Sequence, residues 1–146
     1  MEVTLFTWIV GVAGLLIMCL LFVLQFIAIL RPRADWTIKN VYGSDPGGTD
    51  PRAFFAFSQG MAWADVIFWG PLQLAGSVGM LLGQRWGFLL ALMGSMPFIY
   101  TGITIFIWDR DMGYRQNTFM YWVVVWAMFP AFGITEALYC FVRLLE

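Results

Sequence analysis

Residues 75–95 read AGSVGMLLGQRWGFLLALMGS, and small residues are placed symmetrically about the centre of this stretch at Arg85. They recur at every fourth position on both sides of it: Ala75, Gly79 and Gly83 before it, and Gly87, Ala91 and Ser95 after it. Such a stripe lets the backbone of a neighbouring transmembrane helix approach closely. We therefore predict a tight antiparallel hairpin in which residue 83 meets 87, residue 79 meets 91 and residue 75 meets 95.

The hairpin lies within two of four long apolar stretches, at about residues 5–30, 54–82, 86–108 and 118–144. Each stretch exceeds the roughly 20 residues that a helix needs to cross the hydrocarbon core of a bilayer. Strands of a membrane barrel are only about 10 residues long and alternate apolar with polar residues, which these stretches do not. We expect an all-α, integral membrane protein: a four-helix transmembrane bundle that forms one domain over residues 1–146, with a cytoplasmic loop at 31–53.

The composition supports this class and excludes others. Hydrophobic residues make up 61% of the chain and charged residues 12%, and the formal net charge is −1. A soluble domain carries about 25% charged residues, so this chain could not cover a water-facing surface. The absence of a basic excess excludes a nucleic-acid partner. The bilayer is the expected partner, together with other membrane subunits or a second copy of the chain.

The distribution of Lys and Arg predicts the orientation. The loops at 31–53 and 109–117 hold six of them, whereas the N-terminus, the 83–87 turn and the C-terminus hold two. Cytoplasmic loops carry the excess of positive residues. We therefore expect a multi-pass protein with both termini on the non-cytoplasmic side.

Two carboxylates, Asp65 and Glu136, fall inside the apolar stretches. An ionisable residue within a transmembrane segment is a functional hypothesis by default, because a charge there is costly. At 1.5 Å per residue, Asp65 lies about 15 Å and Glu136 about 27 Å from the loop side. The two are therefore too far apart in depth to act as one catalytic pair, and each has its own candidate partners.

Around Asp65, the candidate ligand or proton residues are Gln25, Tyr100 and Thr101, together with Trp69, which lies one helical turn away. An aromatic wall beside an acid suits a cationic or amphipathic ligand. Packing explains Trp69 equally well, and a structural role for Asp65 that fixes helix register carries the same weight as a functional one.

Glu136 has Gln73 at a similar depth, and Arg143 two turns along its own helix. A long arginine side chain can extend along a helix towards such an acid. An interfacial acid paired with Arg143 is therefore the favoured interpretation of Glu136.

Three prolines, Pro71, Pro97 and Pro130, lie near the middle of the last three apolar stretches. Each removes a backbone donor and distorts its helix. The resulting kinks either open a central cavity or only shape the packing.

The chain has no histidine, and its two cysteines, Cys19 and Cys140, are far apart in sequence. The sequence therefore indicates neither a metal site nor a cofactor, and no catalytic constellation is present. The leading hypothesis is a non-enzymatic subunit or accessory protein that packs in a larger membrane complex or homo-oligomer. The alternative is a small transporter, channel or lipid-ligand binder that uses Asp65 and Trp69. A membrane-embedded enzyme acting on an apolar substrate ranks third.

Overall fold

The computed structural model describes residues 1–41, 51–112, 123 and 127–146, and this part of the chain contains helices and no strands. The all-α prediction is therefore confirmed. In order, the elements are α1 (Leu5–Leu30), α2 (Asp35–Asn40), α3 (Pro51–Ala64), the π-helical turn η1 (Asp65–Trp69), α4 (Gly70–Leu81), α5 (Arg85–Met112) and α7 (Phe129–Leu145).

These elements can be compared with the four expected stretches. The α1 helix covers 5–30, α3, η1 and α4 together cover the second stretch without a break, and α5 covers the third. Most of 118–128, the first part of the fourth stretch, lies outside the described residues. Two helices, Leu5–Leu30 and Arg85–Ile107, are long and apolar enough to cross a membrane, with mean hydropathies of 2.8 and 1.7.

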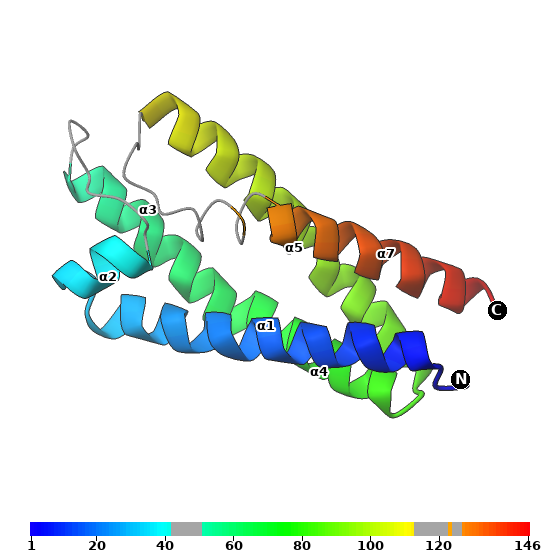
Figure 1. The fold of residues 1–146 in the computed structure, drawn as a ribbon. Helices are drawn as coiled ribbons and strands as arrows, with labels where there is room; N and C mark the ends of the chain where they lie inside the picture. The colour runs from blue at the N-terminus through cyan, green and yellow to red at the C-terminus, as the bar shows by residue number, and fades with distance from the viewer. Residues whose placement is uncertain (42–50, 113–122, 124–126) are drawn as a thin grey trace.

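Both ends of the chain lie at the same end of the bundle as the turn between α4 and α5 (Figure 1). The amino group of Met1 donates a hydrogen bond to the Gly83 carbonyl over 2.6 Å, and the Arg85 guanidinium donates to the Leu144 carbonyl over 3.1 Å. Arg143 donates to the Glu2 carbonyl. We call this the terminal end, and the opposite end, where α1 leads into α2 and α3 begins, the loop end.

The α4–α5 hairpin is tight, but its register differs from the predicted one. A Cβ atom on Gly79 would lie 2.5 Å from the Cα of Gly87, and one on Gly76 would lie 2.5 Å from the Ala91 nitrogen. Residue 79 therefore meets 87 instead of 91. Ala75 is exposed, and its neighbour Gly76 takes the position against α5.

The turn explains this shift, because Gly83, which the prediction had placed opposite Gly87, forms the turn itself. Gly83 has a φ of 66°, a left-handed conformation that glycine adopts without steric cost. The N–H of Gln84 donates to the Gly79 carbonyl and the N–H of Gly83 to the Met80 carbonyl, each over 2.9 Å. This pair of bonds is a Schellman motif, so Gly83 ends α4 instead of packing against Gly87.

Ser95 also has a different neighbour from the predicted one. A Cβ on Gly133 of α7 would lie 2.9 Å from the Ser95 carbonyl, so this part of α5 faces α7. Farther along the same interface, a Cβ on Gly102 would lie 2.4 Å from Cγ of Pro130. Gly102 thus makes room for the proline ring, and Pro130 shapes the packing between α5 and α7.

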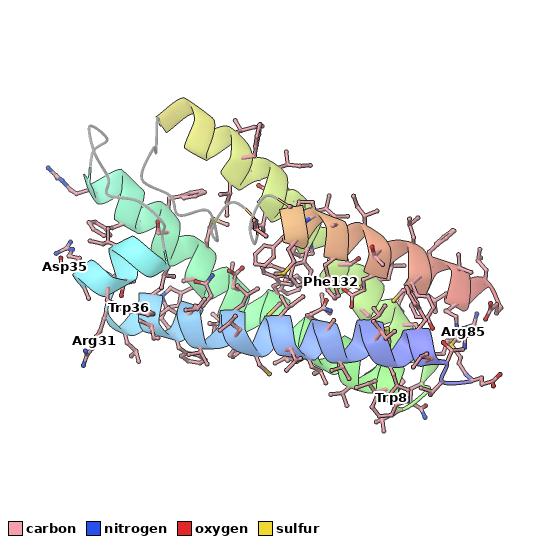
Figure 2. All side chains as sticks on the ribbon, in the orientation of Figure 1. Trp8, Arg31, Asp35, Trp36, Arg85 and Phe132 are labelled. Atoms are coloured by element: carbon pink, nitrogen blue, oxygen red, sulfur yellow. The ribbon has the colours of Figure 1, made fainter. Side chains whose placement is uncertain are left out.

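The core is built in layers along the bundle, and α1, the continuous η1–α4 segment, α5 and α7 contribute to each layer. Towards the terminal end, the buried apolar layer consists of Val10, Met80, Phe88, Ala91 and Cys140. Towards the loop end, a second apolar layer consists of Met18, Trp69, Phe98 and Phe129, and Phe132 packs against it near the middle of the bundle (Figure 2). The residues between the two layers are polar or glycine.

Candidate functional site: two amide–carboxyl pairs inside the bundle

The layer between the two apolar layers contains a hydrogen-bonded pair formed by Gln73 of α4 and Glu136 of α7. The side-chain amide Nε2 of Gln73 donates to Oε1 of Glu136 over 2.7 Å. The same nitrogen lies 3.4 Å from Oγ of Ser77, one turn along α4. All three side chains are completely buried. We call Gln73, Ser77 and Glu136 the polar layer.

Glycines of the two remaining helices provide the space for the polar layer. A Cβ on Gly14 of α1 would lie 2.6 Å from Oγ of Ser77 and 3.0 Å from Nε2 of Gln73. A Cβ on Gly94 of α5 would lie 2.2 Å from Oε1 of Gln73. A larger residue at either position would displace a polar side chain. Because Gly14 and Gly94 have no side chain, the backbones of α1 and α5 can pack directly against the pair.

Two oxygens of the polar layer are buried and have no hydrogen-bond partner among the described residues: Oε1 of Gln73 and Oε2 of Glu136. Both are acceptors when the glutamate is ionised, and an unsatisfied buried acceptor is costly. A protonated carboxyl group carries one O–H donor, so a proton on Glu136 would supply a donor that this pair otherwise lacks. A small cation would supply the same positive charge.

The structure places Glu136 differently from the sequence interpretation, in which it is interfacial and paired with Arg143. Glu136 lies beside Gly14, which is about 14 Å along α1 from its start at 1.5 Å per residue. Arg143 instead forms a salt bridge of 2.7 Å with Glu146. Two helical turns separate Arg143 from Glu136. Arg143 has closer acceptors at the terminal end, in Glu146 and the Glu2 carbonyl.

The second pair joins Gln25 of α1 to Asp65, the first residue of η1. Nε2 of Gln25 donates to Oδ2 of Asp65 over 2.8 Å. Both side chains are half-buried, in contrast to the polar layer. Gln25 was one of the partners expected for Asp65 from depth alone.

The other residues expected near Asp65 lie in different surroundings. Trp69 is buried, its Nε1 donates to the Gly94 carbonyl over 2.8 Å, and its ring packs edge-on against Phe98 with centroids 4.6 Å apart. Trp69 therefore belongs to the apolar core, with its polar atom engaged. Tyr100 is 67% exposed, and Thr101 is buried in α5.

The π-helical turn between Asp65 and Trp69 follows from Pro71. Proline has no N–H to donate to the carbonyl four residues earlier, at Ile67, and its ring clashes with that carbonyl. The chain widens instead, and the N–H of Gly70 bonds to the carbonyl of Asp65, five residues earlier. Gly70 also fits against the ring of Phe22, which a side chain at this position would overlap.

The two carboxyl groups are separate sites. Their neighbours on α1, Gly14 and Gln25, are eleven residues apart in the sequence, or about 16 Å along the helix. Acid–base chemistry between two carboxyl groups needs them within about 10 Å of each other. The described residues also contain no group of three or more His, Cys, Asp or Glu side chains that could hold a metal ion.

Gln73 and Glu136 are recognisable as candidates from the sequence, whereas the roles of Gly14 and Gly94 and the joint burial of the polar layer are not. The sequence does indicate that glycines could make room for neighbouring side chains, because α1 and α5 each carry glycines within apolar turns. It does not specify which glycine faces which polar side chain.

No protein-family model, curated protein or solved structure matches this chain.

Proposed function

We propose that this chain is a non-enzymatic membrane protein that crosses the bilayer four times and acts as a subunit or accessory protein in a larger membrane complex or homo-oligomer. Its outer surface, not an internal site, is the functional surface in this proposal.

The observation that carries the proposal is the inverted distribution of polarity. The polar layer is completely buried, whereas large apolar side chains are exposed on every long helix of the described chain. The most exposed of them on α1, η1, α5 and α7 are Leu5, Leu30, Ile67, Ile103 and Leu145. Exposed apolar area on this scale marks contact with lipid or with another protein.

The continuity of the helices supports four crossings. From Pro51 to Leu81 the chain is helical without interruption, because η1 joins α3 to α4. This length exceeds the roughly 20 residues needed to span the hydrocarbon core. In the last stretch, π-helical Ala127 and Met128 lead directly into α7.

The hydrogen bonding and the separation of the two carboxyl groups inside the bundle support a non-enzymatic role. Both carboxyl groups accept a hydrogen bond from a glutamine of a neighbouring helix, and they are far apart. Such pairs stabilise transmembrane helix association by about 0.6 kcal/mol on average. In this proposal they hold the helices in register.

The test is the size of the particle that the full-length chain forms in a mild detergent, measured by light scattering coupled to size exclusion. We expect a particle that contains several chains and that persists on dilution. A protein that stays monomeric at all concentrations, both alone and when purified from its native membrane, would contradict the proposal.

A second candidate function is the movement of protons or small cations through the polar layer. The unpartnered oxygens of Gln73 and Glu136 favour it. In proteoliposomes with an internal pH dye, Glu136→Gln would then abolish a flux that the wild type shows, whereas a purely structural pair predicts no flux in either protein.

A further inference from the structure

We propose that the loop end contains a binding site for the phosphate group of an anionic phospholipid, formed by Arg31, Arg33 and Arg52. The proposal goes beyond the subunit role and depends on one part of it, the insertion of the chain into a bilayer.

The site is a cavity of about 600 Å³ where the end of α1 meets the first turns of α3. Arg31 and Arg33 line it from the segment that follows α1, and Arg52, Phe55 and Gln59 line it from α3. Small-molecule sites in proteins have volumes of about 300–1,000 Å³. The cavity is thus large enough for a lipid headgroup.

The lining has the chemistry that a phosphate diester requires. Among the described residues, the lining contains three guanidinium groups and no carboxylate. Each guanidinium presents a planar array of donors that matches two phosphate oxygens at once, and it stays charged at any physiological pH. Gln59 adds a neutral amide.

One of these arginines is already positioned by an aromatic ring. The guanidinium carbon of Arg33 lies 5.7 Å from the centroid of the Phe55 ring, within the range of a cation–π interaction. An oriented guanidinium loses less side-chain freedom when an anion binds.

The surroundings of the cavity favour a lipid over a free phosphate ion. Exposed apolar side chains continue from the cavity along the last turns of α1, where Phe26 is 45% and Leu30 76% exposed. Acyl chains attached to a phosphate in the cavity would lie along them. Trp36, which is exposed at this end of the bundle, is a residue type found at the level of lipid headgroups (Figure 2).

The orientation of the chain agrees with this assignment. The excess of Lys and Arg places the loop end in the cytoplasm, and the cytoplasmic leaflet holds the anionic lipids. Basic pockets between helices on that side are typical sites for acidic headgroups. Asp35 is exposed at the same end of the bundle but does not line the cavity (Figure 2).

The experiment uses the delipidated full-length chain in an uncharged detergent, titrated with short-chain phosphatidylglycerol. The thermal midpoint of unfolding is followed by circular dichroism. Short-chain phosphatidylcholine and inorganic phosphate are titrated in parallel. We expect phosphatidylglycerol to raise the midpoint in a saturable manner, and the other two to leave it unchanged at the same concentrations.

The triple variant Arg31→Gln, Arg33→Gln and Arg52→Gln should lose the response, with affinity roughly tenfold weaker for each arginine removed. Replacement of the same three by lysine keeps the charge but removes the fork geometry, and should leave a weaker response. Arg85→Gln, at the terminal end, is the matched control and should respond as the wild type does.

Three outcomes would overturn the proposal: an equal shift with phosphatidylcholine, an unchanged response in a folded triple-glutamine variant, or a shift with inorganic phosphate alone. The last would identify a site for free phosphate. Because binding is measured in detergent, its failure is distinguishable from failure of the subunit proposal, which is judged by particle size.

Discussion

The terminal half and the loop half of the bundle pack differently. In the terminal half, α4 and α5 approach each other backbone to backbone at Gly79 and Gly87, and the polar layer is completely enclosed. In the loop half, the Gln25–Asp65 pair is half-buried and a cavity opens between α1 and α3. The glycines at the contact between α4 and α5 therefore allow a closer packing than the loop half shows.

Pro71 marks the boundary between the two halves. The widened turn that it causes separates α3, which contacts α1, from α4, which contacts both α1 and α5. The terminal half is thus the more interlocked one, and substitutions there should disturb the protein most.

The largest effect is expected from Gly79→Leu in the terminal half. The new side chain would meet the backbone of Gly87 and the Trp86 ring, neither of which can move aside easily. Overpacking of this kind costs about 3 kcal/mol or more of unfolding free energy when backbone is in the way. Unfolding in mixed micelles, followed by circular dichroism, measures the loss.

The control for this substitution is Leu89→Phe on the outer face of the same hairpin, where Leu89 is exposed. We expect less than about 0.5 kcal/mol of change there. Equal tolerance at positions 79 and 89 would refute the close approach of α4 and α5.

The next effect concerns the polar layer. Glu136→Leu removes the acceptor of Gln73 and leaves its buried amide unpaired, at an expected cost of about 2 kcal/mol. Glu136→Gln retains an acceptor of the same shape and should cost less than about 0.5 kcal/mol. The same micelle unfolding assay compares the two variants.

A double-mutant cycle isolates the pair itself. Combining Gln73→Leu with Glu136→Leu should destabilise less than the sum of the two single substitutions, because the second removes the group that the first leaves unsatisfied. Strict additivity would show that the two side chains do not interact in the folded protein.

A smaller effect is expected at Asp65 in the loop half. Asp65→Leu strands the Gln25 amide, but that pair is half-buried, so we expect a loss of about 1 kcal/mol. Asp65→Asn retains an oxygen that accepts from Gln25 and should be close to neutral. A loss at Asp65→Leu as large as that at Glu136→Leu would remove the distinction between the halves.

The last prediction concerns which half of the protein faces the cytoplasm. A cysteine at Thr4 should react with an impermeant thiol reagent in intact cells, whereas cysteines at Ser44 and Gln116, which lie outside the described residues, should not. The native Cys19 and Cys140 are replaced by alanine for this purpose. Labelling at Ser44 in intact cells would reverse the assignment.

The sequence alone determined the helical class, the extent of the long apolar helices and the two carboxyl groups placed among them. These features are local: they depend on the length of an apolar run and on the cost of a charge within it. The presence of a tight hairpin at residues 75–95 was also readable, because small residues at a fixed spacing mark close helix contact wherever they occur.

The tertiary structure alone decided which residues meet. The register of the hairpin depends on the three residues, 82–84, that its turn consumes, and the partner of Glu136 depends on how α4 and α7 are aligned by helices elsewhere in the chain. Glutamine and arginine at suitable depths are both chemically acceptable partners for an acid. Only the packing of four helices, with Gly14 and Gly94 making room, places Gln73 beside Glu136 and leaves Arg143 at the terminal end.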